Sequence, residues 1–297
     1  MTATLTPTMN SRREKVNFLS LGERIHGLLQ LPAEAEAPYP VLIVSHGAGE
    51  FKENYIEMAE YLAGRGIASL MVDMHGHGES GGPAFGIDMR AWVADIQAAI
   101  DFIHNRLDLD DSRIGALGLS SGGTAILEAA VVDPRLKALV ALDATVMDTL
   151  PVSVSLLMRG LSAFGYVKKL VTGSDLKISL ISMLDGLKLA SDPEINQRLQ
   201  KDPGKLRAFA AFPLPGAKQA FIVNTIRRVP KIKAATMVLW GEDDELDPIS
   251  TAHRLYNSLT CTKSLEIVAG NGHVGHLDRN RERVFELTAD WLKKHLG

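Results

Sequence analysis

The chain is poor in cysteine and has no long apolar run. Its single cysteine, Cys261, cannot form a disulfide within the chain, which excludes a disulfide-stapled secreted scaffold and favours a cytoplasmic protein. No apolar stretch is long enough to cross a bilayer, and the polar start of the chain lacks the apolar segment of a secretory signal. We therefore expect no stable membrane insertion, and disorder over residues 1–12.

The chain also lacks an excess of either charge. It has 32 Lys and Arg against 35 Asp and Glu, a net charge of -3, so it offers no basic surface for nucleic acid. Hydrophobic residues make up 46% of the chain and charged residues 23%, the balance of an ordinary globular protein. A small molecule is the expected partner, and the oligomeric state stays open between monomer and homodimer.

Buried-strand patterns alternate with helical patterns along most of the chain. After a hairpin over residues 15–32, continuous apolar runs that suit strands buried on both faces occupy residues 40–49, 67–78, 112–123, 136–144, 235–248 and 263–276. Helical patterns occupy residues 54–66, 88–107, 124–134, 249–259 and 281–296. This alternation predicts the α/β class, with a mainly parallel, doubly wound sheet.

Residues 145–233 interrupt the alternation. They contain amphipathic helical patterns and no buried-strand run, so we expect a helical cap inserted into a core formed by residues 1–144 and 234–297. The insertion leaves the sheet where a strand ends, the position of a lid. Most of its larger apolar side chains should be buried within the cap and a minority should line an acyl pocket: Leu156, Leu157, Met158, Phe164, Leu184 and Phe212.

A serine between glycines stands where a predicted strand meets a predicted helix. The stretch GLSSGG, residues 118–123, fits a nucleophile elbow, a tight turn that exposes Ser120 at the edge of the sheet. Chance matches to G-x-S-x-G are common, so the strand before it and the helix after it carry the interpretation. The alternative is that both serines only cap the helix.

A serine nucleophile needs a base and an orienting acid, and the chain supplies both in the order Ser, acid, His. The bases on offer are His273 and His276, which follow the last predicted strand. One candidate acid is Asp143, at the end of another strand, but we favour Asp244, which belongs to an acidic loop. The strand before the histidines ends in an acidic loop with Glu242, Asp243, Asp244, Glu245 and Asp247.

Two backbone groups are candidates for an oxyanion hole. The N–H of Ser121 lies at the start of the helix after the elbow, and the N–H of Ala48 lies in the glycine loop after the strand at 40–45. His46, His75 and His77 lack a metal-ligand spacing, so we expect structural roles for them and no metal.

These segments resemble the α/β-hydrolase superfamily and, within it, the lysophospholipase and monoacylglycerol lipase group. The likeness runs through residues 45–80, the elbow GLSSGG, the acid loop LWGEDDELDP and the stretch GNGHVGHLD. In this family the acid is the Asp three residues after the glycine of the acid loop. The resemblance therefore implies Asp244 as the acid and His273 as the base, with His276 as a neighbour in the loop.

The resemblance and the motifs together predict a serine hydrolase of carboxylic esters that needs no cofactor. Short to medium acyl or aryl esters are expected, including esters like monoacylglycerol. Substrate-binding residues are not predicted. The alternatives are a thioesterase, an amidase or peptidase, or an acyltransferase that uses the same triad; a non-catalytic ligand-binding protein of the same fold is more remote.

Overall fold

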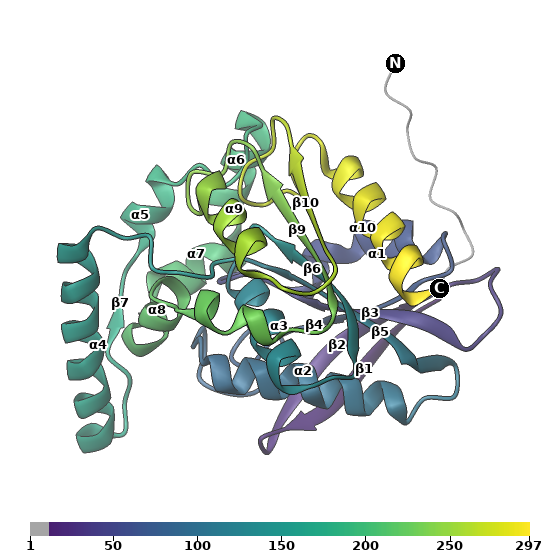
Figure 1. Cartoon of the computed structure of the whole chain (residues 1–297). Coiled ribbons are helices and arrows are strands. Elements are labelled where there is room, and N and C mark those ends of the chain that lie inside the picture. The colour runs from purple at the N-terminus through teal and green to yellow at the C-terminus, as the bar shows by residue number, and fades with distance from the viewer. Residues whose placement is uncertain (1–11) are drawn as a thin grey trace.

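The computed structural model describes residues 12–297, except for the side chains of residues 183, 185, 215 and 217. A central sheet carries helices on both faces, and a further group of helices stands to one side (Figure 1). The strands are β1 (Arg12–Ser20), β2 (Glu23–Leu31), β3 (Tyr39–Ser45), β4 (Ala68–Val72), β5 (Leu109–Leu119), β6 (Leu136–Leu142), β7 (Lys177–Ile178), β8 (Phe212–Pro213), β9 (Ala235–Gly241) and β10 (Lys263–Val268).

The helices fill the connections between these strands. They are η1 (Lys52–Tyr55), α1 (Ile56–Ala63), α2 (Met89–His104), α3 (Ser121–Val132), α4 (Val152–Thr172), α5 (Ile181–Gly186), α6 (Pro193–Gln200), α7 (Pro203–Ala210), α8 (Leu214–Phe221), η2 (Thr225–Arg227), η3 (Val229–Lys231), α9 (Ile249–Ser258) and α10 (Arg281–Leu296). Of these, α4 to α8 lie between β6 and β9.

The main sheet has eight strands in the order β1-β2-β4-β3-β5-β6-β9-β10. Its first two pairings, β1 with β2 and β2 with β4, are antiparallel, and the others are parallel. The order runs outward in both directions from β3 and β5, so the loops after the parallel strands gather at one edge. The predicted mainly parallel sheet of the α/β class is confirmed.

Side chains alternate between the two faces of the sheet and form two core layers. On β3, Val41 and Ile43 join the core under α2, α3 and α9, whereas Leu42 and Val44 join the core under α1 and α10. Because both faces are covered, the central strands are apolar throughout, which explains their continuous apolar runs.

The region between β6 and β9 also contains a pair of short strands that the sequence did not indicate. The two-residue strands β7 and β8 pair antiparallel, Lys177 with Pro213 and Ile178 with Phe212, and form a separate small sheet. Strands this short leave no periodic pattern in a sequence. They tie the end of α4 to the start of α8.

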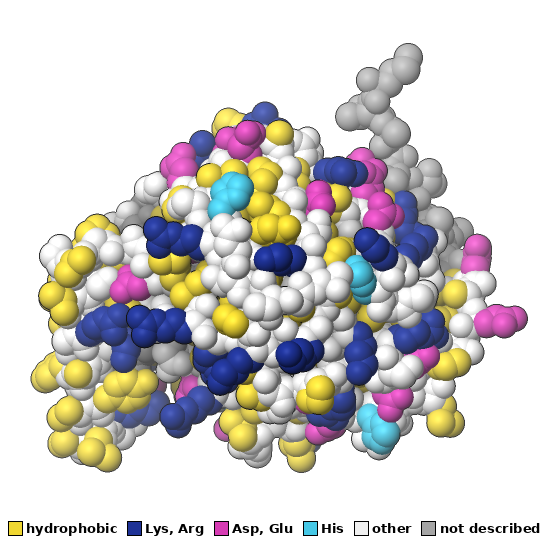
Figure 2. Space-filling model, viewed as in Figure 1, with side chains coloured by type: hydrophobic (Ala, Val, Ile, Leu, Met, Phe, Trp, Pro, Cys, Tyr) yellow, Lys and Arg dark blue, Asp and Glu magenta, His cyan; other side chains and the backbone are white. Residues whose placement is uncertain are grey.

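The prediction that the apolar residues of the insertion are mostly buried is wrong for α4. Leu184 and Phe212 are buried, but Leu156, Leu157 and Phe164 are each more than 60% exposed. Helix α4 stands at the outer edge of the molecule, and its neighbouring helix is α8 (Figure 1). Figure 2 shows apolar side chains and Lys or Arg side chains together on this part of the surface. The apolar residues of α4 are spread around the whole helix. Because only one side of the helix is packed, the apolar residues on its other sides are exposed to solvent.

The predicted disorder of residues 1–12 falls outside the described residues except at Arg12, which begins β1. In the part of the chain that the structure describes, no helix combines the length and the apolar character needed to span a bilayer.

Candidate active site

Ser120 lies in a strained turn between β5 and α3. Its φ of 52° and ψ of -119° place a non-glycine residue in a region that L-residues rarely adopt. Close backbone packing enforces this turn, since a Cβ on Gly118 would lie 2.2 Å from the carbonyl oxygen of Gly122. A Cβ on Gly122 would lie 2.2 Å from the carbonyl oxygen of Ser45. The glycines predicted to make the turn tight are thus required by contact.

His273 and Asp244 meet at the same edge of the sheet. Nδ1 of His273 lies 2.9 Å from Oδ2 of Asp244, and because a carboxylate only accepts, the imidazole donates its Nδ1 proton. The other oxygen of Asp244 accepts from the backbone N–H groups of Leu246, at 2.8 Å, and Asp247, at 3.0 Å. This arrangement holds the imidazole in one tautomer, with Nε2 left to accept a proton.

Buried carboxyl groups around His273 determine the direction in which its pKa is shifted. Burial opposes the imidazolium form, but the charge and hydrogen bond of Asp244, with further negative charge from Asp247 and Asp143, raise the pKa of His273 above its ordinary value. Burial and the nearby charge of Asp244 raise the pKa of Asp143 well above its ordinary value. Asp143 accepts from the N–H of Gly241 at 2.7 Å, and His273 pairs with Asp244.

A second polar chain reaches Ser120 from the acid loop. Ser120 Oγ lies 3.3 Å from Thr145 Oγ1, which lies 2.7 Å from Oδ2 of Asp247. Burial raises the pKa of Asp247 to about 6, against the opposing effects of His273 and Thr145. Among the described residues, no hydrogen bond joins Ser120 to His273, although both line one cavity.

That cavity is small and is partly covered by segments between β6 and β9. It holds about 50 Å³ and combines a few polar groups with an apolar wall. The polar members are Ser120, His273, Glu50 and Lys205. The apolar members are Ala48, Leu119, Leu187, Leu189, Phe209, Phe221, Leu246 and Val274. The apolar residues that the sequence singled out do not line it; the insertion contributes other residues to the apolar wall, and the core contributes the rest.

Glu50 and Lys205 place opposite charges in this cavity. Glu50 Oε2 accepts from the hydroxyl of Tyr55 at 3.0 Å, and Lys205 Nζ lies 3.8 Å from Glu50 Oε1. Burial opposes ionisation of Glu50, but the charge of Lys205 and the hydrogen bond from Tyr55 lower the pKa of the carboxyl group. His276 stacks on Tyr55 with ring centroids 4.2 Å apart and, with its pKa lowered by burial to about 4, is neutral.

The two predicted oxyanion donors flank Ser120. Ala48 lines the cavity in the loop after β3, and Ser121 is the first residue of α3. A first-turn N–H has no acceptor within its own helix, so the N–H of Ser121 is available to a ligand. Burial lowers the pKa of His46 to about 4, and its Nε2 accepts from the N–H of Met74 at 3.0 Å, which fixes the base of this loop.

The other two histidines that the sequence singled out support the loop after β4. His75 Nδ1 lies 2.5 Å from Oδ1 of Asp95, whereas His77 Nδ1 lies 3.1 Å from the carbonyl oxygen of His75. Burial lowers the pKa of His77 to about 3. Each therefore has a structural partner within the fold.

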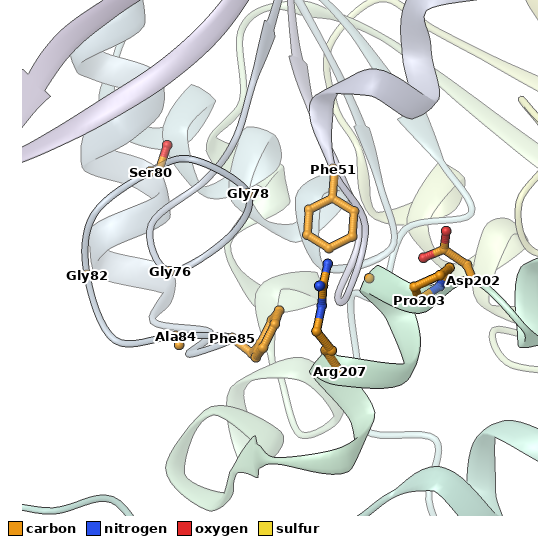
Figure 3. Close-up of a pocket in the computed structure, with 11 residues that line it drawn as sticks. Phe51, Gly76, Gly78, Ser80, Gly82, Ala84, Phe85, Asp202, Pro203 and Arg207 are labelled. Carbon is orange, nitrogen blue, oxygen red and sulfur yellow. The ribbon is translucent and has the colours of Figure 1, made fainter.

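A larger open hollow lies beside the small cavity. It holds about 670 Å³ and is lined by the glycine-rich loop after β4, by Phe51 and by the start of α7. Figure 3 shows Arg207 pointing from α7 toward Phe51, with Phe85 alongside. Because Glu50 and Lys205 line the small cavity, segment 50–51 and helix α7 form the wall between the two spaces.

Sequence reasoning missed three polar residues of the site. Glu50 directly follows the glycine loop, and this position was a usable signal. Thr145 follows Asp143 at the end of β6, where the first loop residues of a parallel strand face the site. Lys205 left no signal, because it reaches the cavity only through the packing of α7.

The chain matches the model of the family described as serine aminopeptidase, S33, over residues 36–280. A monoglyceride lipase homolog of monkeypox virus is 28% identical in an alignment 255 residues long that covers 83% of this chain and 85% of that protein. A thiohydrolase of Eupenicillium brefeldianum is 25% identical and is matched over 96% of this chain and 95% of its own length.

The solved structure of the α/β hydrolase GrgF from Penicillium sp. sh18 superposes with a TM-score of 0.80 at 23% identity, over 96% of this chain and 99% of that one. This similarity shows the fold. The family match covers most of the chain and includes the elbow, the acid loop and the histidine loop. The chain therefore belongs to the serine aminopeptidase S33 family of α/β-hydrolases and is a hydrolase.

Proposed function

We propose that the protein is a serine hydrolase of carboxylic esters. The observation that carries this proposal is that His273, hydrogen-bonded to Asp244, lines the same cavity as the strained Ser120. A hydroxyl group, an imidazole with a free Nε2 and an orienting carboxylate are the groups that acyl transfer requires.

In the proposed reaction, His273 Nε2 takes the proton of Ser120 as Oγ attacks the ester carbonyl. Asp244 stabilises the imidazolium that forms, and the N–H groups of Ala48 and Ser121 donate to the oxyanion. The imidazolium then protonates the leaving alcohol. Water, activated by the same histidine, releases the acid from the acyl-enzyme and restores Ser120.

The cavity favours a small acyl group. At about 50 Å³ it is well below the size of ordinary ligand pockets, and its wall is mostly apolar. Short acyl esters fit best, while longer chains require the cap over residues 145–233 to move. The neighbouring hollow of about 670 Å³ provides open space for the leaving part of the substrate.

Thioesters are the second candidate substrates. The thiohydrolase relative spans nearly the whole chain, and the same serine chemistry cleaves both bonds. Side-by-side rates on an ester and a thioester with the same acyl group separate the two.

The test is hydrolysis of p-nitrophenyl esters from acetate to palmitate by the wild type and by Ser120→Ala. We expect the substitution to lower kcat by at least about a thousandfold, with a short-chain optimum in the wild type. Labelling by a fluorophosphonate probe tests the nucleophile independently. A folded wild type that neither labels nor hydrolyses any ester would refute the proposal and favour a ligand-binding role.

A further inference from the structure

The hydroxyl group of Ser120 has a polar neighbour other than the histidine. Its Oγ lies 3.3 Å from Thr145 Oγ1, and Thr145 Oγ1 lies 2.7 Å from Asp247 Oδ2. Within the described residues, Ser120 has no hydrogen bond to His273. In the resting protein, Ser120 thus ends a chain of three residues that leads away from the proposed base.

The protons of this chain can be assigned from its chemistry. An ionised carboxylate only accepts, so Thr145 donates its single hydroxyl proton to Asp247. Thr145 Oγ1 then offers Ser120 only lone pairs, and Ser120 must donate its proton to Thr145. The same proton passes to His273 when a serine is activated. Thr145 and His273 therefore compete for one proton.

Thr145 and Asp247 are held too firmly to follow a moving serine. The N–H of Thr145 donates to the carbonyl oxygen of Ser120 at 3.2 Å, and the carbonyl oxygen of Thr145 accepts from the hydroxyl of Thr124. Trp240 Nε1 donates to the carbonyl oxygen of Asp247 at 2.7 Å. To reach the imidazole, the Ser120 side chain must rotate and give up its contact with Thr145.

We infer that Thr145 is a positioning residue: its hydroxyl, fixed by Asp247, directs the Ser120 proton away from His273 until substrate binds. The inference rests on the proposed roles of Ser120 and His273. It explains why a buried threonine and a buried aspartate converge on a hydroxyl that already has an imidazole in its cavity.

The test is the second-order rate constant for fluorophosphonate labelling of the full chain on the high-pH plateau of the labelling rate, where Asp247 is ionised and His273 is unprotonated. Thr145→Val keeps the branched shape and removes the competing acceptor, so we expect labelling two- to ten-fold faster than in the wild type. Thr145→Ser retains the hydroxyl and should label at the wild-type rate. Thr172→Val, on the exposed end of α4, is the matched control and should also label at that rate.

A purely structural role for Thr145 predicts the opposite direction. If folded Thr145→Val labels at or below the wild-type rate, the inference is wrong while the proposed function stands. Because that variant leaves Oδ2 of Asp247 without its donor, Thr145→Val/Asp247→Asn provides a second reading with the same expected increase. A wild type that does not label overturns the proposed function, and the inference with it.

Discussion

Asp244 raises the proton affinity of His273, and this effect has a measurable sign. His273 acts as a base only when unprotonated, so kcat/KM should rise with pH through a pKa above the ordinary value of about 6.5. Asp244→Asn removes the charge that raises this pKa. We expect the rise to move to lower pH and the plateau rate to fall by about 10²–10⁴-fold, as followed by pH–rate profiles on a short p-nitrophenyl ester.

Glu245 supplies the control for that measurement. It lies in the same loop, is exposed and pairs with Lys188 on the surface. Glu245→Gln should leave the profile within about 0.3 pH units of the wild type, because solvent screens an exposed charge. An unchanged profile in Asp244→Asn would contradict the proposed role of Asp244.

Single residues also show how far the sequence leads. Ser120, Asp244 and His273 could be proposed because each follows a recognisable strand and parallel strands end at one edge. The structure brings Asp244 and His273 into contact, and their catalytic roles stay predictions. Thr145 and Lys205 could not be proposed, because their contacts depend on side-chain directions that no short pattern encodes.

At the scale of the elements, close backbone contacts allow only glycine at position 122 of the elbow. A Cβ at Gly122 would lie 2.2 Å from the carbonyl oxygen of Ser45 and 2.5 Å from that of His46. Gly122→Ala should therefore lower the free energy of unfolding by about 1–3 kcal/mol and reduce esterase activity with it. Chemical denaturation and initial rates measure the two effects.

Gly160, within α4, provides the matched substitution. A Cβ there meets nothing within 4 Å. Gly160→Ala should raise the free energy of unfolding by about 0.5–1 kcal/mol, because alanine loses less backbone freedom in a helix. If both substitutions changed the free energy of unfolding equally, the space around Gly122 would be large enough for a methyl group.

Helix α7 should set the acyl-chain preference. Phe209 is buried on α7 and lines the cavity with Ser120. Phe209→Ala enlarges that space, so kcat/KM on octanoate relative to acetate should rise by about tenfold, a magnitude within reach of a few buried methylene groups. Phe164→Ala, exposed on α4, should leave the ratio unchanged; a ratio unmoved in both variants would mean that acyl chains lie elsewhere.

Helices and strands were predictable where a sequence pattern is compatible with only one structure and one state of burial. The strands of the core follow the apolar runs, but the apolar pattern of α4 predicted burial and α4 is largely exposed. A helix with apolar residues on several faces does not say which face is packed, since that depends on its partner α8.

At the scale of the whole molecule, stability should depend on the two core layers rather than on α4. Leu292, on α10, is fully buried, whereas Leu170, on α4, is 88% exposed. Leu292→Ala should lower the free energy of unfolding by about 2–5 kcal/mol, and Leu170→Ala should change it by less than about 0.5 kcal/mol. Urea denaturation compares them, and a large loss in Leu170→Ala would indicate that α4 is covered in solution.

The overall fold was predictable because the alternation of a buried-strand pattern with a helical pattern recurs along most of the chain. The packing of residues 145–233 against the rest of the chain was not predictable, since it depends on contacts between distant segments. Asp278, fully buried, accepts from the N–H groups of Ser191 and Gly272, both at 2.7 Å, and so joins the cap to the histidine loop. One aspartate among many in a sequence gives no sign of such a role.

The strands before and after the cap, β6 and β9, are hydrogen-bonded neighbours. Because these strands are parallel, the insertion leaves β6 at one edge of the sheet and enters β9 at the opposite edge, and no ladder of the main sheet passes through it. A change in the length of this segment therefore alters no strand register of the main sheet. We therefore expect that exchanging residues 145–233 between relatives at these two strands would change the part of the cavity wall formed by Leu187, Leu189, Phe209 and Phe221 and would leave the ladders of the main sheet in place.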